Sequence, residues 1–276
     1  MLPLYLQALS FSDIHGTSED CIHAAADMAA DLGIAGIDIE DRLLESYEPH
    51  YLQQLAHQIE SRGVTFGHCG LIVDFRAPLS SISFEIERAK KLIDAVPYLG
   101  ISAIRVPGNG VVGGQTVEST FTAVRKKFQQ ICEYAEKYGA TVYLHNHNHG
   151  STPSNGVQII RMLDEVKSPT LSYVLDTGQF QGSPGASGVS RPEKNAEPEL
   201  YDSITACAPR ARTVRAKFYF RRYAEEHWLD YPRIVRILRS ANFQGPISIV
   251  YEPRGKMLST EALPVAVRYL TKLFKN

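Results

Sequence analysis

Residues 135–147 read AEKYGATVYLHNH, and this stretch contains the pattern that repeats along the whole chain. A predicted helix ends at Gly139, a residue that readily takes the left-handed conformation with which many helices close. The apolar run at 141–144 then predicts a short β-strand, and a polar segment rich in histidine follows it directly. The stretch therefore predicts an alternating α/β fold with candidate functional side chains at the end of a strand.

The same alternation of short apolar strands and amphipathic helices covers the chain from end to end. The predicted strands span residues 4–9, 35–39, 64–68, 103–106, 141–144, 171–175, 213–216 and 246–251. The predicted helices span residues 20–32, 51–62, 83–99, 121–138, 157–166, 199–208, 231–241 and 261–274. Regular alternation favours parallel strands joined by right-handed crossovers. Because such barrels typically need about 250 residues, eight units in 276 residues predict a single (β/α)8 TIM barrel domain over residues 1–276.

The composition excludes several classes of protein. A formal net charge of -1 does not suit a chain that holds nucleic acid by bulk charge, and 44% hydrophobic residues are too many for a disordered chain. No apolar run approaches the roughly 18 residues of a membrane-spanning helix. Cys21, Cys69, Cys132 and Cys207 are far apart, and neither they nor the first residues predict secretion. We therefore expect a cytoplasmic protein with reduced thiols that binds neither nucleic acid nor membrane.

Titratable side chains gather where the predicted strands end, which is where TIM barrels carry their chemistry. They are Asp13, His15, Asp38, Glu40, His68, Arg105, His145, His147, His149, Asp176, Arg215, Lys217, Glu252 and Arg254. Groups of both charge signs thus converge on one rim, which a purely structural barrel would not need.

The histidines after the fifth predicted strand are the most unusual feature of this rim. His145 and His147 alternate along an extended segment, so their side chains could point into the mouth of the barrel together. With the carboxylates of Asp176 and Glu252 they predict a site for a divalent metal such as Mn, Co, Mg or Zn. A polar loop with solvated imidazoles is the structural alternative for the histidines, and a turn or N-cap residue is the alternative for Asp176.

Two cations end the seventh predicted strand. Arg215 and Lys217 share one face, where they could hold a substrate oxyanion, a phosphate or the catalytic carboxylates. The alternative is simple charge balance for Asp176 and Glu252. A carboxylate that directly follows an apolar strand is costly to bury unless it is paired, metal-bound or hydrated.

Several residues of the rim are candidates for contacts with a substrate. These candidates are Glu40, His68, Arg105, Gln179, Arg215 and Arg254. The long segment 179–198, rich in Gly, Ser and Pro, is predicted to be a lid or substrate loop, or else a tolerated surface insertion.

Several segments of the chain are similar to those of a known family. They are AGIDIE at 35–40, LGISAIRVPG at 99–108, AEKYGATVYLHNH at 135–147, VLDTGQ at 174–179, LDYPRIV at 229–235 and GPISIVYE at 245–252. In this order and spacing, the chain resembles the sugar phosphate isomerase/epimerase superfamily with the xylose isomerase-like TIM barrel, in its branch with a His-Asn-His segment. The resemblance covers almost the whole chain and implies the same barrel.

The resemblance also implies a site for one divalent metal, bound through Glu, Asp, His and Glu at strands five to eight. Asp176 and Glu252 match two of these positions. His145 stands at the position of the first Glu, and Arg215 stands at that of the His, where a cation would repel a metal ion. Gln179 stands where a His is common.

Two forms of the site follow from the resemblance. In one, the two carboxylates and His145 hold a divalent metal, with help from His147 or Gln179. In the other, no metal is present, and Arg215 and Lys217 act as the electrophiles.

The activity that the resemblance implies is that of an isomerase or epimerase on a keto sugar or related polyol, so the expected partner is a small-molecule sugar. Glu252 would remove a proton next to the carbonyl, and Lys217 would stabilise the charge that forms. His145 or His147 would serve as the second base or as a replacement ligand. A homo-oligomer formed through a helix face is common for this fold.

Three alternative functions stay open. A lyase or dehydratase on a keto-glycoside or inosose would share the proton abstraction and then expel a substituent. An endonuclease IV-like enzyme has a similar barrel, but it needs a multi-zinc cluster and a basic face for DNA, which a net charge of -1 disfavours. A metal-free sugar-binding relative without catalysis would explain why two usual ligand positions have changed.

Overall fold

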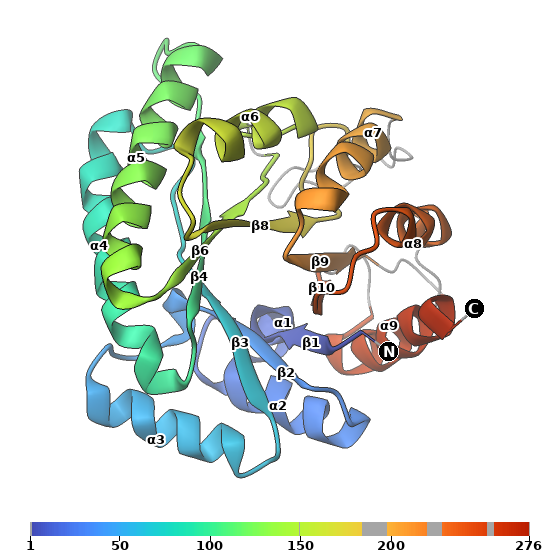
Figure 1. Cartoon of the computed structure of the whole chain (residues 1–276). Helices are drawn as coiled ribbons and strands as arrows, with labels where there is room; N and C mark the ends of the chain where they lie inside the picture. The colour runs from blue at the N-terminus through green and yellow to red at the C-terminus, as the bar shows by residue number, and fades with distance from the viewer. Residues whose placement is uncertain (1, 149, 184–197, 220–227, 253–256, 276) are drawn as a thin grey trace.

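Eight parallel strands form a closed ring at the centre of the structure (Figure 1). This computed structural model describes residues 2–148, 150–183, 198–219, 228–252 and 257–275. Around the ring the strands follow the order β1-β10-β9-β8-β6-β4-β3-β2, so the first strand pairs with the last. The strands of the ring are β1 (Leu4–Gln7), β2 (Gly36–Glu40), β3 (Thr65–Gly70), β4 (Ala103–Pro107), β6 (Thr141–His145), β8 (Leu171–Asp176), β9 (Thr213–Phe218) and β10 (Ile247–Tyr251). The predicted (β/α)8 TIM barrel is confirmed.

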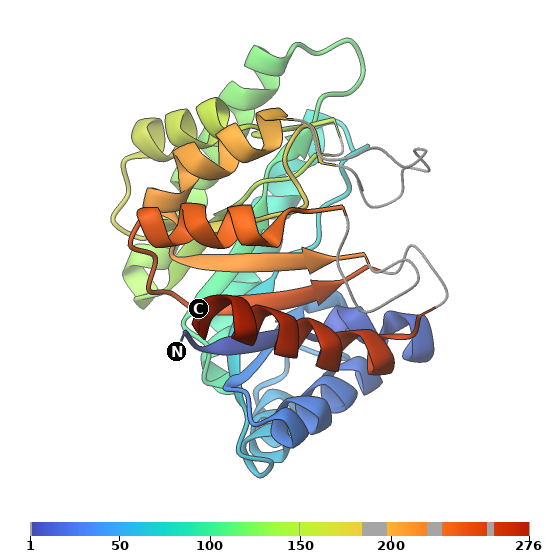
Figure 2. The ribbon, with the colours of Figure 1, turned by 90° about the vertical axis from the view of Figure 1, so that its right-hand side faces the viewer.

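Helices cover the outside of the ring (Figures 1 and 2). They are α1 (Ser12–His15), α2 (Asp20–Leu32), α3 (Pro49–Glu60), α4 (Ile82–Ala95), α5 (Val117–Tyr138), α6 (Gly156–Val166), α7 (Pro198–Cys207), α8 (Tyr231–Ser240) and α9 (Ser259–Lys275). In Figure 2 the strands of the ring point the same way, and both chain termini lie at the end where the strands begin. The opposite end, where the strands finish, therefore carries the connections expected to hold the site.

Element boundaries differ from the prediction where a single residue has a strong local effect. The predicted helix 83–99 stops at Ala95 and continues as a 3-10 turn, because Pro97 has no N–H to donate. The predicted helix 121–138 begins at Val117, because Thr116 and Ser119 cap each other's backbone and start the helix earlier. Its end is as predicted, with Gly139 at a φ of 66°.

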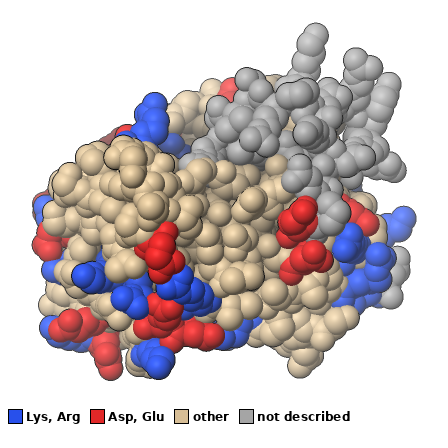
Figure 3. Space-filling view, turned by 90° about the horizontal axis from the view of Figure 1, so that it is seen from above, with Lys and Arg blue, Asp and Glu red and all other residues tan. Residues whose placement is uncertain are grey.

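The core lies between the strands and the helices. On α5, for example, the buried face presents Phe121, Val124, Phe128 and Ile131 to the ring, whereas the other face is exposed. The four cysteines are buried and unpaired, as the sequence indicates. In the described part of the chain, no helix is long and apolar enough to cross a membrane. Among the described residues on the face in Figure 3, basic and acidic side chains are interspersed without a continuous basic field.

A second, two-stranded sheet lies at the rim, where β5 (Asn109–Gly110) pairs antiparallel with β7 (Ser151–Thr152). The fully buried Lys127 of α5 donates from Nζ to Oδ1 of Asn109 at 2.6 Å and lies 3.0 Å from Oε2 of Glu85 in α4. Asn109 in turn donates to both carboxylate oxygens of Glu85. This network fastens the segment after β4 to two outer helices.

Candidate active site

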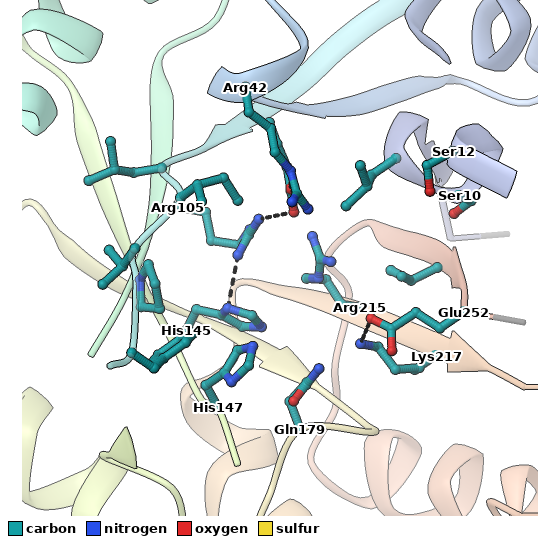
Figure 4. Close-up of a pocket in the computed structure, with 18 of the residues that line it drawn as sticks. Ser10, Ser12, Arg42, Arg105, His145, His147, Gln179, Arg215, Lys217 and Glu252 are labelled. Atoms are coloured by element: carbon teal, nitrogen blue, oxygen red, sulfur yellow. Dashed lines mark hydrogen bonds and ion pairs between the residues drawn. The ribbon is translucent and has the colours of Figure 1, made fainter. Parts of the chain in front are cut away.

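A cavity of about 440 Å³ lies at the C-terminal ends of the strands (Figure 4). Predicted residues that line it are Glu40, Arg105, His145, His147, Gln179, Arg215, Lys217 and Glu252. Asp176 and His68 are buried and are not part of this lining. Arg254, His149 and most of the predicted substrate loop (184–197) fall outside the described residues.

Asp176 ends β8 and is completely buried. Its Oδ2 accepts a hydrogen bond from Nε of Arg215 at 3.1 Å, and Nζ of Lys217 lies 3.9 Å away. Its Oδ1 accepts from the backbone N–H of Gly178. The pairing follows from the ladder between β8 and β9, in which Asp176 and Arg215 are directly opposite each other. The carboxylate therefore has its counter-charge within the chain.

His145 ends β6 and has both ring nitrogens in contact with charged side chains. Nη1 of Arg105 lies 2.9 Å from Nδ1, and Oδ2 of Asp176 lies 3.4 Å from Nε2. Because a guanidinium can only donate, Nδ1 accepts and the ring proton belongs on Nε2. Burial lowers the pKa of His145 well below its usual value of 6.5, and the charge of Arg105 lowers it further. The ring is therefore neutral, and its basic lone pair is already used.

The side chain of Arg105 lies between His145 and Glu40, and its Nη2 donates to Oε1 of Glu40 at 2.9 Å. Gly70 of β3 leaves space for it, because a Cβ at Gly70 would lie 2.1 Å from Nη2. Burial, followed by the nearby charge of Arg215, lowers the pKa of Arg105 to about 10. The guanidinium therefore stays charged at neutral pH, although burial and the nearby charge of Arg215 make its charged form less stable than it is in water.

The carboxylate of Glu40 also accepts hydrogen bonds from a second guanidinium, that of Arg42. Nε of Arg42 donates to Oε2 of Glu40 at 3.0 Å, and its Nη2 lies 2.8 Å from the same oxygen. Burial alone would raise the pKa of Glu40, but Arg105 and then Arg42 outweigh it, so the pKa is lowered. Sequence reasoning missed Arg42, whose only signal was its place just beyond the second strand end.

Lys217 and Glu252 form a second ion pair across β9 and β10. Nζ of Lys217 donates to Oε1 of Glu252 at 2.5 Å. The Lys217 side chain is 1% exposed, whereas that of Glu252 is 29% exposed. Tyr231 of α8 donates to the backbone oxygen of Lys217 and so fixes the end of β9. Glu252 is thus a carboxylate of the site that a molecule in the cavity can reach.

His147 lies on the other side of the cavity from Glu252, with Gln179 between them in the view of Figure 4. Its ring stacks on Phe75, with centroids 4.3 Å apart, and meets the edge of His145 at 5.5 Å. Phe75 comes from the segment after β3 and also lines the cavity. Phe75 could not be selected from the sequence, because an isolated aromatic residue in a loop carries no periodic signal.

His68, a predicted substrate contact, forms an inner polar layer with Asp38. Its Nδ1 lies 3.0 Å from Oδ1 of Asp38, and its backbone N–H donates to the same oxygen. Burial lowers the pKa of His68, although Asp38 opposes this effect. Contact of His68 with a substrate stays a prediction that its buried position does not favour.

The donors of the site do not suit a divalent metal. Asp176 is bonded to Arg215, Glu252 is bonded to Lys217, and the lone pair of His145 is taken by a guanidinium. A metal ion between the two carboxylates would face two fixed positive charges in a poorly solvated place. Throughout the described ranges, no three His, Cys, Asp or Glu side chains are grouped to hold a metal ion. The predicted ligands, which also included His147, therefore stay a prediction that these charges disfavour.

Comparisons with known proteins agree on the fold. The family described as "Xylose isomerase-like TIM barrel" matches residues 26–273. No curated protein matches the sequence. Among solved structures, an L-ribulose 3-epimerase is similar with a TM-score of 0.75 and 13% identity, covering 100% of this chain and 96% of that one.

Two further structures of this kind carry ligands in their descriptions. D-allulose 3-epimerase from Methylomonas sp. in complex with D-allulose has a TM-score of 0.74 and 18% identity, covering 98% of this chain and 96% of its own. A xylose isomerase-like TIM barrel protein from Mycobacterium smegmatis in complex with magnesium has a TM-score of 0.72 and 13% identity, covering 99% and 97%. At such identities the likeness concerns the fold.

Proposed function

The chain belongs to the xylose isomerase-like TIM barrel family, and from that premise we propose that it is a sugar isomerase or epimerase. The proposed reaction begins with removal of a proton from the carbon next to the carbonyl of a keto sugar or related polyol. The observation that carries the proposal is the pair of Glu252 and Lys217 at the wall of the cavity, where a reachable carboxylate lies beside a buried ammonium. Such a pair can take a proton and stabilise the negative charge that forms.

The proposed base is Glu252. Its carboxylate takes the proton from carbon, and the electrons of the C–H bond move to the carbonyl oxygen, which becomes an enolate oxygen. Lys217 donates to that oxygen, because it lines the cavity beside Glu252, while Arg215, which also lines the cavity, binds another part of the substrate. Asp176 supports the reaction by orienting Arg215 rather than by touching the substrate.

The proton that completes the reaction has two possible sources. In an isomerisation, Glu252 returns it to the former carbonyl carbon, and the hydroxyl proton of the neighbouring carbon moves to the former carbonyl oxygen. In an epimerisation, a group on the opposite side of the cavity delivers it to the other face of the enolate, and His147 lies in that direction (Figure 4). His145 is not a candidate for this step, because both its nitrogens are engaged.

The divalent metal implied by the resemblance is not part of the proposed mechanism. The two carboxylates and His145 already have chain cations as partners, so the donor set does not fit a metal ion. The chain supplies its own positive charge at the place where the enolate would form.

Solvent exchange tests the proposal. Protein treated with a chelator is incubated in deuterium oxide with a panel of ketoses, keto sugar acids and ketose phosphates, and NMR follows loss of the C–H signal next to the carbonyl. We expect exchange with at least one substrate, and Glu252→Gln should slow it about 10²–10⁴-fold. Glu136→Gln, at an exposed position of α5, is the control and should leave the rate unchanged.

Other outcomes would contradict the proposal in different ways. An unsaturated product would indicate a lyase, which shares the first step and then expels a substituent. Tight binding without exchange for every substrate of the panel would favour a sugar-binding relative. Undiminished exchange in Glu252→Gln would remove Glu252 from the role of base.

A further inference from the structure

We propose that the substrate of this cavity carries a negatively charged group, a carboxylate or a phosphate, that is bound by Arg215 and Arg42. This inference rests on the proposed function, because it names the class of substrate for the same site. It depends on the charges that line the cavity and on the hydrogen-bond donors that are left over.

The side chains that line the cavity carry more positive than negative charge. Its lining includes four cations, which are Arg42, Arg105, Arg215 and Lys217. Two lining carboxylates, Glu40 and Glu252, and the buried Asp176 oppose them. His145 adds no charge, because its ring is neutral. The buried Asp38 also acts on Arg105, so the excess of positive charge is confined to the residues that line the cavity, where four cations face two carboxylates.

Arg215 has donors directed at the cavity. Its Nε is used by Asp176 and its Nη1 donates to Oε1 of Gln7 at 3.1 Å. For its Nη2, the described residues offer no acceptor, although the side chain is 95% buried and lines the cavity. Figure 4 shows this guanidinium in the middle of the site, below Arg42 and beside Arg105. A buried cation that has unused hydrogen-bond donors in a cavity forms a binding site for an anion.

Arg42 completes the site from the solvent side. Its Nε and Nη2 contact Glu40, so Nη1 is left without an acceptor among the described residues. Its side chain is 41% exposed, so it can reorient when a ligand enters. Two guanidinium groups, one from β9 and one from the 3-10 turn after β2, match the planar, multidentate geometry of carboxylate and phosphate oxygens.

Three guanidinium groups in one cavity repel one another where water is scarce. The lowered pKa of Arg105, to which Arg215 contributes, is consistent with this crowding. An anionic ligand relieves the repulsion, a neutral sugar leaves it in place, and a divalent cation increases it. The site therefore favours a keto sugar acid or a ketose phosphate over an uncharged ketose.

Calorimetric binding to chelator-treated protein tests this inference with matched ligands. The probes are D-fructose, 2-keto-D-gluconate, D-fructose 6-phosphate and inorganic phosphate. Since a hydrogen bond to a charged group adds about 1.5–3 kcal/mol, one of the two anionic sugars should bind roughly ten- to hundredfold more tightly than D-fructose. Comparison of the two anionic sugars shows whether the site binds a carboxylate or a phosphate. Binding of inorganic phosphate without a sugar would show that the site recognises the phosphate group.

Variants assign the effect to the two arginines. Arg215→Gln should remove the preference for the anionic sugar, and Arg42→Gln should reduce it while leaving Arg105 on Glu40. Arg236→Gln, at an exposed position of α8, is the matched control and should have no effect. If Arg215→Gln does not fold because Asp176 is left unpaired, Arg42→Gln still decides the matter, because its side chain is partly exposed.

The binding result and the exchange result are independent. Equal affinity for neutral and anionic sugars would overturn the inference, even if the neutral sugar undergoes exchange and so supports the proposed function. Selective binding of an anionic sugar without exchange would support the inference and contradict the proposed function. Preference that survives Arg42→Gln and Arg215→Gln would place the anion elsewhere and would also overturn the inference.

Discussion

Nε of Arg215 lies 3.1 Å from Oδ2 of Asp176, so the carboxylate that the resemblance assigns to a metal is already paired with a cation of the chain. The pair is buried where β8 ends beside the middle of β9, and a guanidinium cannot lose its proton at physiological pH. The positive charge beside Asp176 is therefore permanent.

Metal binding should be weak for this reason. We expect Mn²⁺ added to chelator-treated protein to stay free, as measured by the EPR signal of the aqueous ion, because Arg215 and Lys217 repel a divalent ion. Activity in the exchange assay should not depend on added Mg²⁺, Mn²⁺ or Co²⁺. The opposite result would be a fall of the free Mn²⁺ signal by one equivalent per chain, with the signal restored in Asp176→Asn. It would show that the carboxylates bind a metal ion in place of the cations of the chain.

Acid should destabilise the protein through its buried histidines. Burial lowers the pKa of His145 well below 6.5, and burial also lowers that of His68. Below about pH 6.5 these histidines become protonated in the unfolded chain but stay neutral in the native chain. The free energy of unfolding is therefore highest above about pH 6.5 and decreases as the pH falls below that value. Melting temperatures measured from about pH 7.5 down to pH 5.5 should show the decline.

Two glutamine variants make this expectation specific. His145→Gln keeps a donor and an acceptor but cannot titrate, so its melting temperature should depend less on pH. His57→Gln, on the exposed side of α3, should leave the dependence unchanged. If the melting temperatures of the wild type and of His145→Gln depend on pH in the same way, the His145 ring does not have a lowered pKa in the folded protein.

The buried cation of α5 should matter far more than an exposed one on the same helix. Lys127→Met leaves the carboxylate of Glu85 without its cation and should cost about 3–5 kcal/mol in the free energy of unfolding. Lys137→Met removes only a surface pair with Glu133, 3.7 Å apart, and should cost less than about 1 kcal/mol. Denaturation in urea measures both. The double variant Lys127→Met/Glu85→Gln should recover part of the loss, and no recovery would argue against an unpaired carboxylate as its cause.

Gly70→Ala should disturb Arg105 rather than the barrel. The new Cβ would meet the end of a flexible side chain, 2.1 Å from Nη2 and 2.7 Å from Cζ, so the guanidinium must shift away from Glu40 and His145. We expect a loss of about 1–3 kcal/mol in stability, typical of overpacking, and weaker ligand binding in the cavity.

The background variant Arg105→Met provides the control for this effect. With the guanidinium gone, Gly70→Ala should cost clearly less than in the wild type, which a double-mutant cycle measures. Equal costs in the two backgrounds would locate the clash in the strand itself.

The barrel could be predicted because its signal is periodic. Alternation of strands and helices along the chain fixes the number of units, and glycines such as Gly139 mark where helices close. Boundaries failed where one side chain acts locally, as Pro97 and Thr116 do. The small sheet of β5 and β7 was missed, because two-residue strands have no period to detect.

The site could be predicted only in part. Strand ends identified Asp176, Arg215, Lys217 and Glu252, and charge balance among them, one of the interpretations left open, describes the contacts that the structure has. Partners across the barrel, such as Arg105 and His145, are not readable from spacing, because their contact depends on how the ring closes. For the same reason, neither Arg42 nor Phe75 could be selected.

The hydrogen bond from Arg215 to Gln7 joins residues 208 positions apart in the chain. Gln7 belongs to β1, which closes the ring by pairing with β2 on one side and β10 on the other. Contacts between such distant parts of a chain form late in folding, because the intervening loop must first be closed. The central cation of the cavity is thus oriented only once the first and last strands have met. Recovery of ligand binding during refolding should therefore follow ring closure and lag behind the return of helix.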